Sequence, residues 1–188
     1  MRRIILLLTL SLVLPVTAAE LEGVKMPDSL KLANRDLALN GMELRTRFGL
    51  KVYVAGLYVS NKSSDANALI QQPGPKRIAI VMRRNVEADT FLKALRDGIS
   101  ANHNEAQIAS LKDRLDKFDD AINQIKEAKQ GDSIDLDYVP ETGTQILHNG
   151  KMVGTQIAGE DFYRALLRIW LGEKPAQESL KYGWLGKN

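Results

Sequence analysis

Alternating and helical hydrophobic patterns along the chain predict a series of strands and helices. Residues 133–139 (SIDLDYV) alternate apolar with acidic positions, which is typical of a strand with one wet face. Residues 86–102 and the stretch after Asn104 carry apolar side chains at helical spacing, and residues 159–171 do so again before Gly172. The pattern therefore predicts strands first, then two helices, a strand meander and terminal helices.

Two Asn-Gly pairs predict hairpin turns, because both central positions of a type I′ turn need a positive φ angle. The pair at 40–41 is expected to turn the chain between two strands, and the pair at 149–150 is expected to do so in the meander. Residues 41–60 then read as one long strand in which Gly49 marks a bulge or a bend. This order of elements predicts an α+β fold, a largely antiparallel sheet with helices on one face.

The strand predicted over residues 41–60 carries cations among apolar side chains. In a regular strand Arg45, Arg47, Lys51 and Tyr53 point to one face, and apolar residues further along share that face. A half-buried arginine requires an anion, which can be a carboxylate of the same chain or a ligand. Arg47 and Lys51 are expected at the rim or in solvent.

The first residues carry an export pattern. Residues 1–19 (MRRIILLLTLSLVLPVTAA) combine a basic start, an apolar centre, Pro15 and small residues, which predicts a secretory signal peptide; an uncleaved N-terminal anchor is the alternative. The apolar run is shorter than the roughly 20 residues of a membrane helix, so no stable span is expected after cleavage. One domain over residues 20–188 would remain. It has no cysteine and therefore no disulfide.

Most of the formal net positive charge lies in the predicted signal peptide. The formal net charge is +3, but residues 1–19 hold two arginines and no acid. The rest has 24 basic residues against 23 acidic ones. This balance, without a basic stripe, does not favour nucleic-acid binding.

Motifs for metal or cofactor chemistry are missing from the sequence. His103 and His148 stand alone, without cysteine or a second histidine at metal-ligand spacing. The acids at 132, 135 and 137 fit no calcium loop and are interpreted as a solvated strand face rather than as catalytic carboxylates. A serine elbow and a phosphate loop are also absent. The sequence thus predicts no metal, no cofactor and no catalytic residue.

Two segments resemble the chalcone isomerase-like family, and more closely its exported bacterial branch. They are LNGMELRTRFGLKVYVAGLYV at 39–59 and GEDFYRALLRIWLGEKPAQESL at 159–180. Residues 76–95 and 131–154 fit the family in order, so that the resemblance spans roughly residues 21–186. It implies an open-faced β-sandwich, in which a large antiparallel sheet is covered by a helical layer, and together with the signal peptide it implies a periplasmic location.

The resemblance also implies a ligand site. In the plant isomerases an arginine in the cleft between sheet and helices favours the phenolate of a flavonoid precursor. Related proteins without that activity hold a fatty-acid carboxylate with an arginine and a tyrosine. Arg45 matches the arginine, and Tyr53 matches the tyrosine, where the isomerases carry a threonine.

The helix-borne residues of the isomerases have no match here. The family's enzymes carry a tyrosine and an asparagine on the helix after the third family strand. In this chain the corresponding positions are Asp89 or Thr90 and Arg96 or Asp97.

Three hypotheses follow. The leading one is a non-catalytic periplasmic protein that binds a small apolar anion, such as a fatty acid, through Arg45 and Tyr53. The second is an isomerase (an intramolecular lyase) acting on an enone or flavonoid-like substrate, with Arg45 stabilising the oxyanion. The third is a cell-envelope interaction module in which Arg45 pairs with an internal carboxylate and Met42, Phe91 or Trp170 plugs the cleft. An open cavity at Arg45 discriminates between them.

Overall fold

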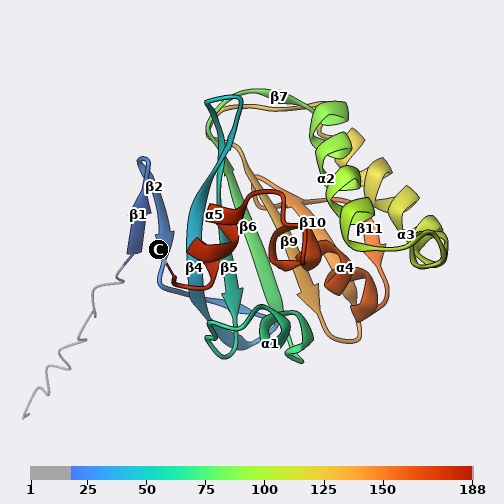
Figure 1. Ribbon diagram of the computed structural model, residues 1–188, viewed down its shortest axis with the longest axis horizontal. Coiled ribbons are helices and arrows are strands. Elements are labelled where there is room, and N and C mark those ends of the chain that lie inside the picture. Colours follow the sequence, from blue (N-terminus) through green and yellow to red (C-terminus); the bar gives the residue numbers. More distant parts are fainter. Residues whose placement is uncertain (1–17, 188) are drawn as a thin grey trace, which may run out of the picture.

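The computed structural model describes residues 18–187, which form an α+β fold around one large sheet. Seven strands pair in the order β11-β10-β9-β6-β5-β4-β3, and all neighbours are antiparallel (Figure 1). The predicted signal peptide lies almost wholly outside the described residues and stays a prediction. The strands of the sheet are β3 (Ser29–Leu32), β4 (Arg35–Arg47), β5 (Leu50–Val59), β6 (Lys76–Met82), β9 (Ser133–Val139), β10 (Gly143–His148) and β11 (Lys151–Ile157).

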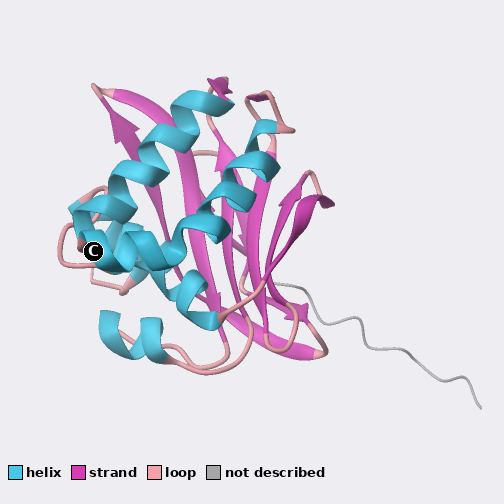
Figure 2. Ribbon diagram, turned by 90° about the vertical axis from the view of Figure 1, so that its right-hand side faces the viewer, coloured by secondary structure: helices cyan, strands magenta, loops and turns pink. Residues whose placement is uncertain are grey.

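Helices cover one face of this sheet, as Figure 2 shows. A two-stranded ladder of β7 (Val86–Glu87) and β8 (Glu127–Ala128) lies at the start of the helical layer. None of the described helices is both long and apolar enough to cross a bilayer. The helices are α1 (Ala66–Gln71), α2 (Ala88–Asn102), α3 (Glu105–Asn123), α4 (Glu160–Leu171) and α5 (Glu178–Trp184).

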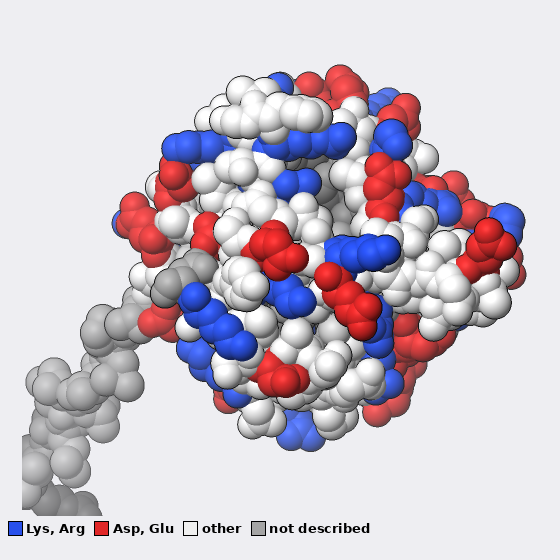
Figure 3. Space-filling model, viewed as in Figure 1, with Lys and Arg blue, Asp and Glu red and all other residues white. Residues whose placement is uncertain are grey.

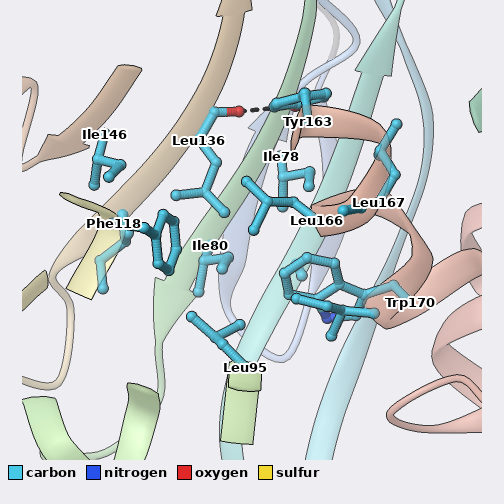
Figure 4. Close-up of a cluster of buried hydrophobic side chains, with 14 of the residues drawn as sticks. Ile78, Ile80, Leu95, Phe118, Leu136, Ile146, Tyr163, Leu166, Leu167 and Trp170 are labelled. Carbon is cyan, nitrogen blue, oxygen red and sulfur yellow. Dashed lines mark hydrogen bonds between the residues drawn. The ribbon is translucent and has the colours of Figure 1, made fainter. Parts of the chain in front are cut away.

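The main core lies between the sheet and α2, α3 and α4 (Figure 4). Trp170 on α4 is fully buried, and Ile80 on β6 and Leu95 on α2 belong to the same cluster. Tyr163 reaches across the layer and donates a hydrogen bond to the backbone oxygen of Leu136 at 2.9 Å. Burial of these large side chains on α4 explains why this helix has an almost uninterrupted apolar face.

A short hairpin covers the other face of the sheet. Its strands β1 (Ala18–Leu21) and β2 (Val24–Pro27) lie on the side away from α2 and α3 (Figure 1). Val24 and Met26 pack with Val54 and Tyr58 of β5 in a second apolar cluster. The strand β5 is therefore covered on both faces, as its apolar sequence requires. The predicted fold, a large antiparallel sheet under a helical layer, is confirmed.

Most predicted helices are confirmed. The stretch after Asn104 forms α3, and this residue closes a capping box with Gln107. Asp65 caps α1 by accepting a hydrogen bond from the backbone N–H of Ala68. The helix α4 ends at Leu171 and is capped by Gly172, as predicted.

The predicted turn at residues 40–41 is wrong. Both residues lie inside β4, at a bulge where the register with β5 shifts. The Asn40 side chain instead donates hydrogen bonds to the backbone oxygens of Ser63 and Trp184. A Cβ atom on Gly41 would lie 2.1 Å from the backbone oxygen of Gly183, so the glycine permits α5 to approach the strand. This Asn-Gly pair serves tertiary packing and not chain reversal.

The single strand predicted over residues 41–60 is also wrong. The chain reverses at Phe48 and Gly49, whose φ angles are 51° and 74°, and β4 and β5 pair on either side of this turn. The other predicted Asn-Gly turn, at 149–150, is confirmed between β10 and β11.

The acidic face predicted for β9 is only partly exposed to solvent. Asp137 is 2% exposed, and Arg77 of the neighbouring β6 binds both of its carboxylate oxygens. Asp135 is half-buried beside the same arginine. The strict alternation identified the correct face but could not show that a cation from the next strand covers it.

Candidate functional site

A cavity of about 320 Å³ opens between the β4–β5 hairpin and α2. Arg45 and Tyr53 both line it, as do Val52, Phe91 and Leu95. Figure 3 shows a hollow in the surface beside the hairpin. Its volume lies at the lower end of the roughly 300–1,000 Å³ range of small-molecule sites. The two residues predicted to bind a ligand therefore meet at one open, largely apolar cavity.

The hairpin brings Arg45 and Tyr53 together. They are direct partners in the register of β4 and β5. Side chains in such a cross-strand pair have Cβ atoms only about 5 Å apart. On one continuous strand they would be separated by about 26 Å, which no carboxylate could bridge. The turn at Phe48 and Gly49 is thus what makes a two-residue site possible.

Arg45 is half-buried, and neutral groups hold its guanidinium. It donates hydrogen bonds to the backbone oxygen of Thr46 and to Oε1 of Gln177, the latter at 3.1 Å. Gln177 also accepts from the Thr46 backbone N–H at 2.9 Å and donates to the Leu44 backbone oxygen at 2.9 Å. Within residues 18–187 Arg45 forms no ion pair. The internal carboxylate of the third hypothesis is not found in this part of the chain.

Tyr53 is buried and oriented from behind. Its hydroxyl oxygen accepts a hydrogen bond from the indole N–H of Trp170 at 3.0 Å. Burial raises the pKa of this phenol above its ordinary value, and the Trp170 hydrogen bond and the charge of Arg45 only partly oppose the rise. The hydroxyl therefore stays protonated, and its hydrogen is available to an acceptor in the cavity.

Apolar side chains form the wall but do not fill the space. The ring of Phe91 meets that of Tyr53 edge-on, with centroids 6.4 Å apart. Trp170 lies buried behind Tyr53, and Met42 packs with the second apolar cluster on the other face of the sheet. None of the three residues considered as plugs closes the cavity.

The helix α2 offers the cavity almost no ionisable chemistry. Of the positions that correspond to the isomerase residues, Thr90 lines the cavity, while Asp89 is exposed. Arg96 points elsewhere and binds Asp119 of α3. Asp97 pairs with Lys93 on its own helix.

The other cations of the hairpin behave as predicted. Arg47 and Lys51 are both exposed, and Arg47 lines the cavity at its rim. Lys51 forms an ion pair with Glu22 from the β1–β2 turn. A further arginine, Arg84, lines the cavity as well.

The histidines take part in no metal site within the described residues. His148 is half-buried and lies 2.9 Å from the Asp132 carboxylate. Burial opposes ionisation of Asp132, but hydrogen bonds from Asn149 and His148 outweigh it and lower its pKa to about 2. This cluster ties the β10–β11 turn to the start of β9.

Sequence reasoning missed the residues that orient the pair. Gln177 and Trp170 follow Arg45 and Tyr53 by 132 and 117 positions. No local pattern connects residues so distant. The one available signal was that both lie in the C-terminal segment that carries the family resemblance.

Comparisons with known proteins agree with this architecture. A crystal structure of a fatty-acid binding protein from Arabidopsis thaliana aligns with a TM-score of 0.69 at 15% sequence identity, over 90% of this chain and 96% of that one. At this identity the likeness concerns the fold. No curated protein matches the chain. The model of the chalcone isomerase-like family matches residues 18–186. The chain therefore belongs to the chalcone isomerase-like family.

Proposed function

We propose that the protein is a non-catalytic periplasmic binder of a fatty acid, or of a similar small apolar anion, from an exported bacterial branch of the family. The observation that carries the proposal is Arg45, which lines an apolar cavity of about 320 Å³ and has no ion pair among the described residues. A cation removed from bulk water and lacking an internal carboxylate is a natural partner for an anion.

The geometry supports a carboxylate in particular. Arg45 and Tyr53 face each other across β4 and β5, so that a guanidinium and a phenol hydroxyl can donate to one carboxylate. A hydrogen bond to a charged group contributes about 1.5–3 kcal/mol. Each buried methylene adds about 0.8 kcal/mol, which favours a ligand with an acyl chain along the wall near Phe91 and Leu95.

The wall of α2 supports binding without turnover. The helix residues Thr90, Phe91, Ala94 and Leu95 line the cavity, and none of them can act as a general acid or base. The plant protein of similar fold is described as a fatty-acid binding protein, which agrees with this proposal.

Titration of the purified protein with palmitate and with hexadecanol tests the proposal. We expect Arg45→Met to weaken palmitate binding at least tenfold and to leave hexadecanol binding nearly unchanged, because only the carboxylate uses the charge. Arg35→Met is the matched control, since Arg35 lies at the far end of the same strand and does not line this cavity. Equal palmitate affinity in Arg45→Met and the wild type would contradict the proposal.

Two further measurements address location and turnover. In a bacterial host we expect a product that lacks residues 1–19 in the periplasmic fraction, identified by its intact mass. A full-length product in the membrane fraction would contradict cleavage. Absorbance of a chalcone mixed with the protein is expected to change only at the uncatalysed rate, and faster cyclisation would refute the non-catalytic assignment.

A further inference from the structure

The tip of the β4–β5 hairpin exposes apolar side chains in an unfavourable conformation. Phe48 is 90% exposed and has a φ angle of 51°, and Leu50 is 52% exposed. Asparagine, aspartate and glycine are the residues that suit the first position of such a turn, while a bulky side chain at positive φ is strained. The exposed ring of Phe48 buries little of its surface in the folded protein. The tip therefore presents apolar surface that the core does not cover.

Arginines surround this tip. The guanidinium carbon of Arg47 lies 5.3 Å from the centroid of the Phe48 ring, and the exposed Arg84 lies across the same cavity. Neither forms an ion pair within residues 18–187. Among the residues that line the cavity, Glu87 is the only acid, against three arginines. In Figure 3 basic side chains form a row below an uncharged cap at the hairpin tip.

The tip also forms part of the exposed rim of the cavity. Phe48 and Leu50 line the cavity together with Arg47 and Arg84, and the same cavity reaches Arg45. Apolar residues that meet a partner at the tip would thus bring that partner to the rim of the cavity.

We propose that this tip docks on an anionic lipid bilayer, so that the cavity faces the bilayer. Phe48 and Leu50 enter the interface between headgroups and acyl chains, where aromatic and aliphatic side chains are favoured. Arg47 and Arg84 contact lipid phosphates, to which basic residues near a membrane surface are attracted. The inference rests on the proposed function, because it lets a fatty acid pass between bilayer and cavity without crossing water.

The test uses vesicles of phosphatidylcholine alone or mixed with phosphatidylglycerol, in sedimentation at low and high salt. We expect binding to the mixed vesicles that weakens at high salt, because the headgroup charges become screened. Phe48→Asn should reduce binding to the mixed vesicles at least tenfold. This variant should fold, because asparagine suits the turn. Met152→Ser is the control: Met152 is an exposed apolar residue, 52% exposed like Leu50, but it lies on β11.

A reporter at the tip shows insertion directly. In Phe48→Trp the new indole should shift its emission to shorter wavelength when mixed vesicles are added, while Trp170 and Trp184 are fully buried and give a constant background. Absence of a shift together with absence of sedimentation would overturn the proposal. Equal sedimentation of Phe48→Asn and wild type would overturn the role of the tip, and so would a dimer that forms through Phe48 without vesicle binding.

The two proposals can fail separately. Vesicle binding in a protein that does not bind palmitate would overturn the proposed function and leave docking intact. Palmitate binding in a protein that ignores both kinds of vesicle would overturn docking alone.

Discussion

Replacing Tyr53 with phenylalanine tests both tasks of this side chain at once. The change removes only a hydroxyl, so the ring and its edge-on contact with Phe91 are kept. In the cavity, a carboxylate loses one hydrogen-bond donor. Behind the cavity, the indole N–H of Trp170 loses the oxygen that lies 3.0 Å away. Tyr53→Phe is therefore expected to lower both affinity and stability.

The magnitudes follow from those two hydrogen bonds. A hydrogen bond to a charged group is worth about 1.5–3 kcal/mol, which corresponds to a loss of palmitate affinity of about 10- to 150-fold. A buried donor left without its acceptor costs about 1–3 kcal/mol of stability. Trp170 is 0% exposed, so its indole N–H has no contact with bulk water in the wild type.

Urea unfolding and palmitate titration measure the two effects. A cycle with Trp170→Phe and the double variant isolates the coupling, expected at about 0.5–1.5 kcal/mol for this hydrogen bond. Hexadecanol is the ligand control, since a neutral headgroup does not form the charge-assisted bond. Unchanged palmitate affinity in a folded Tyr53→Phe protein would refute the two-donor clamp, and additive stability effects would refute the link to Trp170.

Three other substitutions probe the surroundings. Gln177→Glu places a carboxylate beside Arg45, since Nη1 of Arg45 lies 3.1 Å from the present amide oxygen of Gln177. This variant should weaken palmitate binding at least tenfold in the same titration. Tighter binding would show that Arg45 does not hold the ligand. Gly41→Ala should destabilise the protein by about 1–3 kcal/mol in urea, because its Cβ would meet the Gly183 oxygen at 2.1 Å; an unchanged midpoint would contradict this close approach. The pKa of Asp132 is lowered from 3.8 to about 2, so the ionised carboxylate stabilises the fold above pH 4, and this stabilisation is lost as the pH falls toward 2. The difference in unfolding free energy between wild type and Asp132→Asn should therefore shrink over that range. A constant difference would contradict the shift.

Local signals predicted the elements better than the connections between them. The apolar periodicity placed the helices, and the Asn-Gly pair at 149–150 gave a true turn. The pair at 40–41 misled because a glycine can serve close packing as well as a positive φ angle. The actual reversal uses Phe48, which a propensity argument ranks among the worst residues for that position.

Both residues of the predicted pair line the cavity, but their geometry could not be read from the sequence. Arg45 and Tyr53 were expected on one face of a single strand, whereas they face each other across two strands. The open cavity depends on how Phe91 and Trp170 pack, which is a property of the whole core. Gln177 was invisible for the same reason, since only the tertiary fold brings α5 to β4.

The order in which the chain is synthesised determines when the hydrogen bonds to Arg45 and Tyr53 can form. Trp170 and Gln177, which orient Tyr53 and Arg45, emerge from the ribosome more than a hundred residues after the hairpin. Contacts over such separations form late in folding, because a long loop must close first. In a growing chain Arg45 and Tyr53 therefore lack these hydrogen-bond partners, and they gain them only after the segment from 170 to 184 has packed against the hairpin.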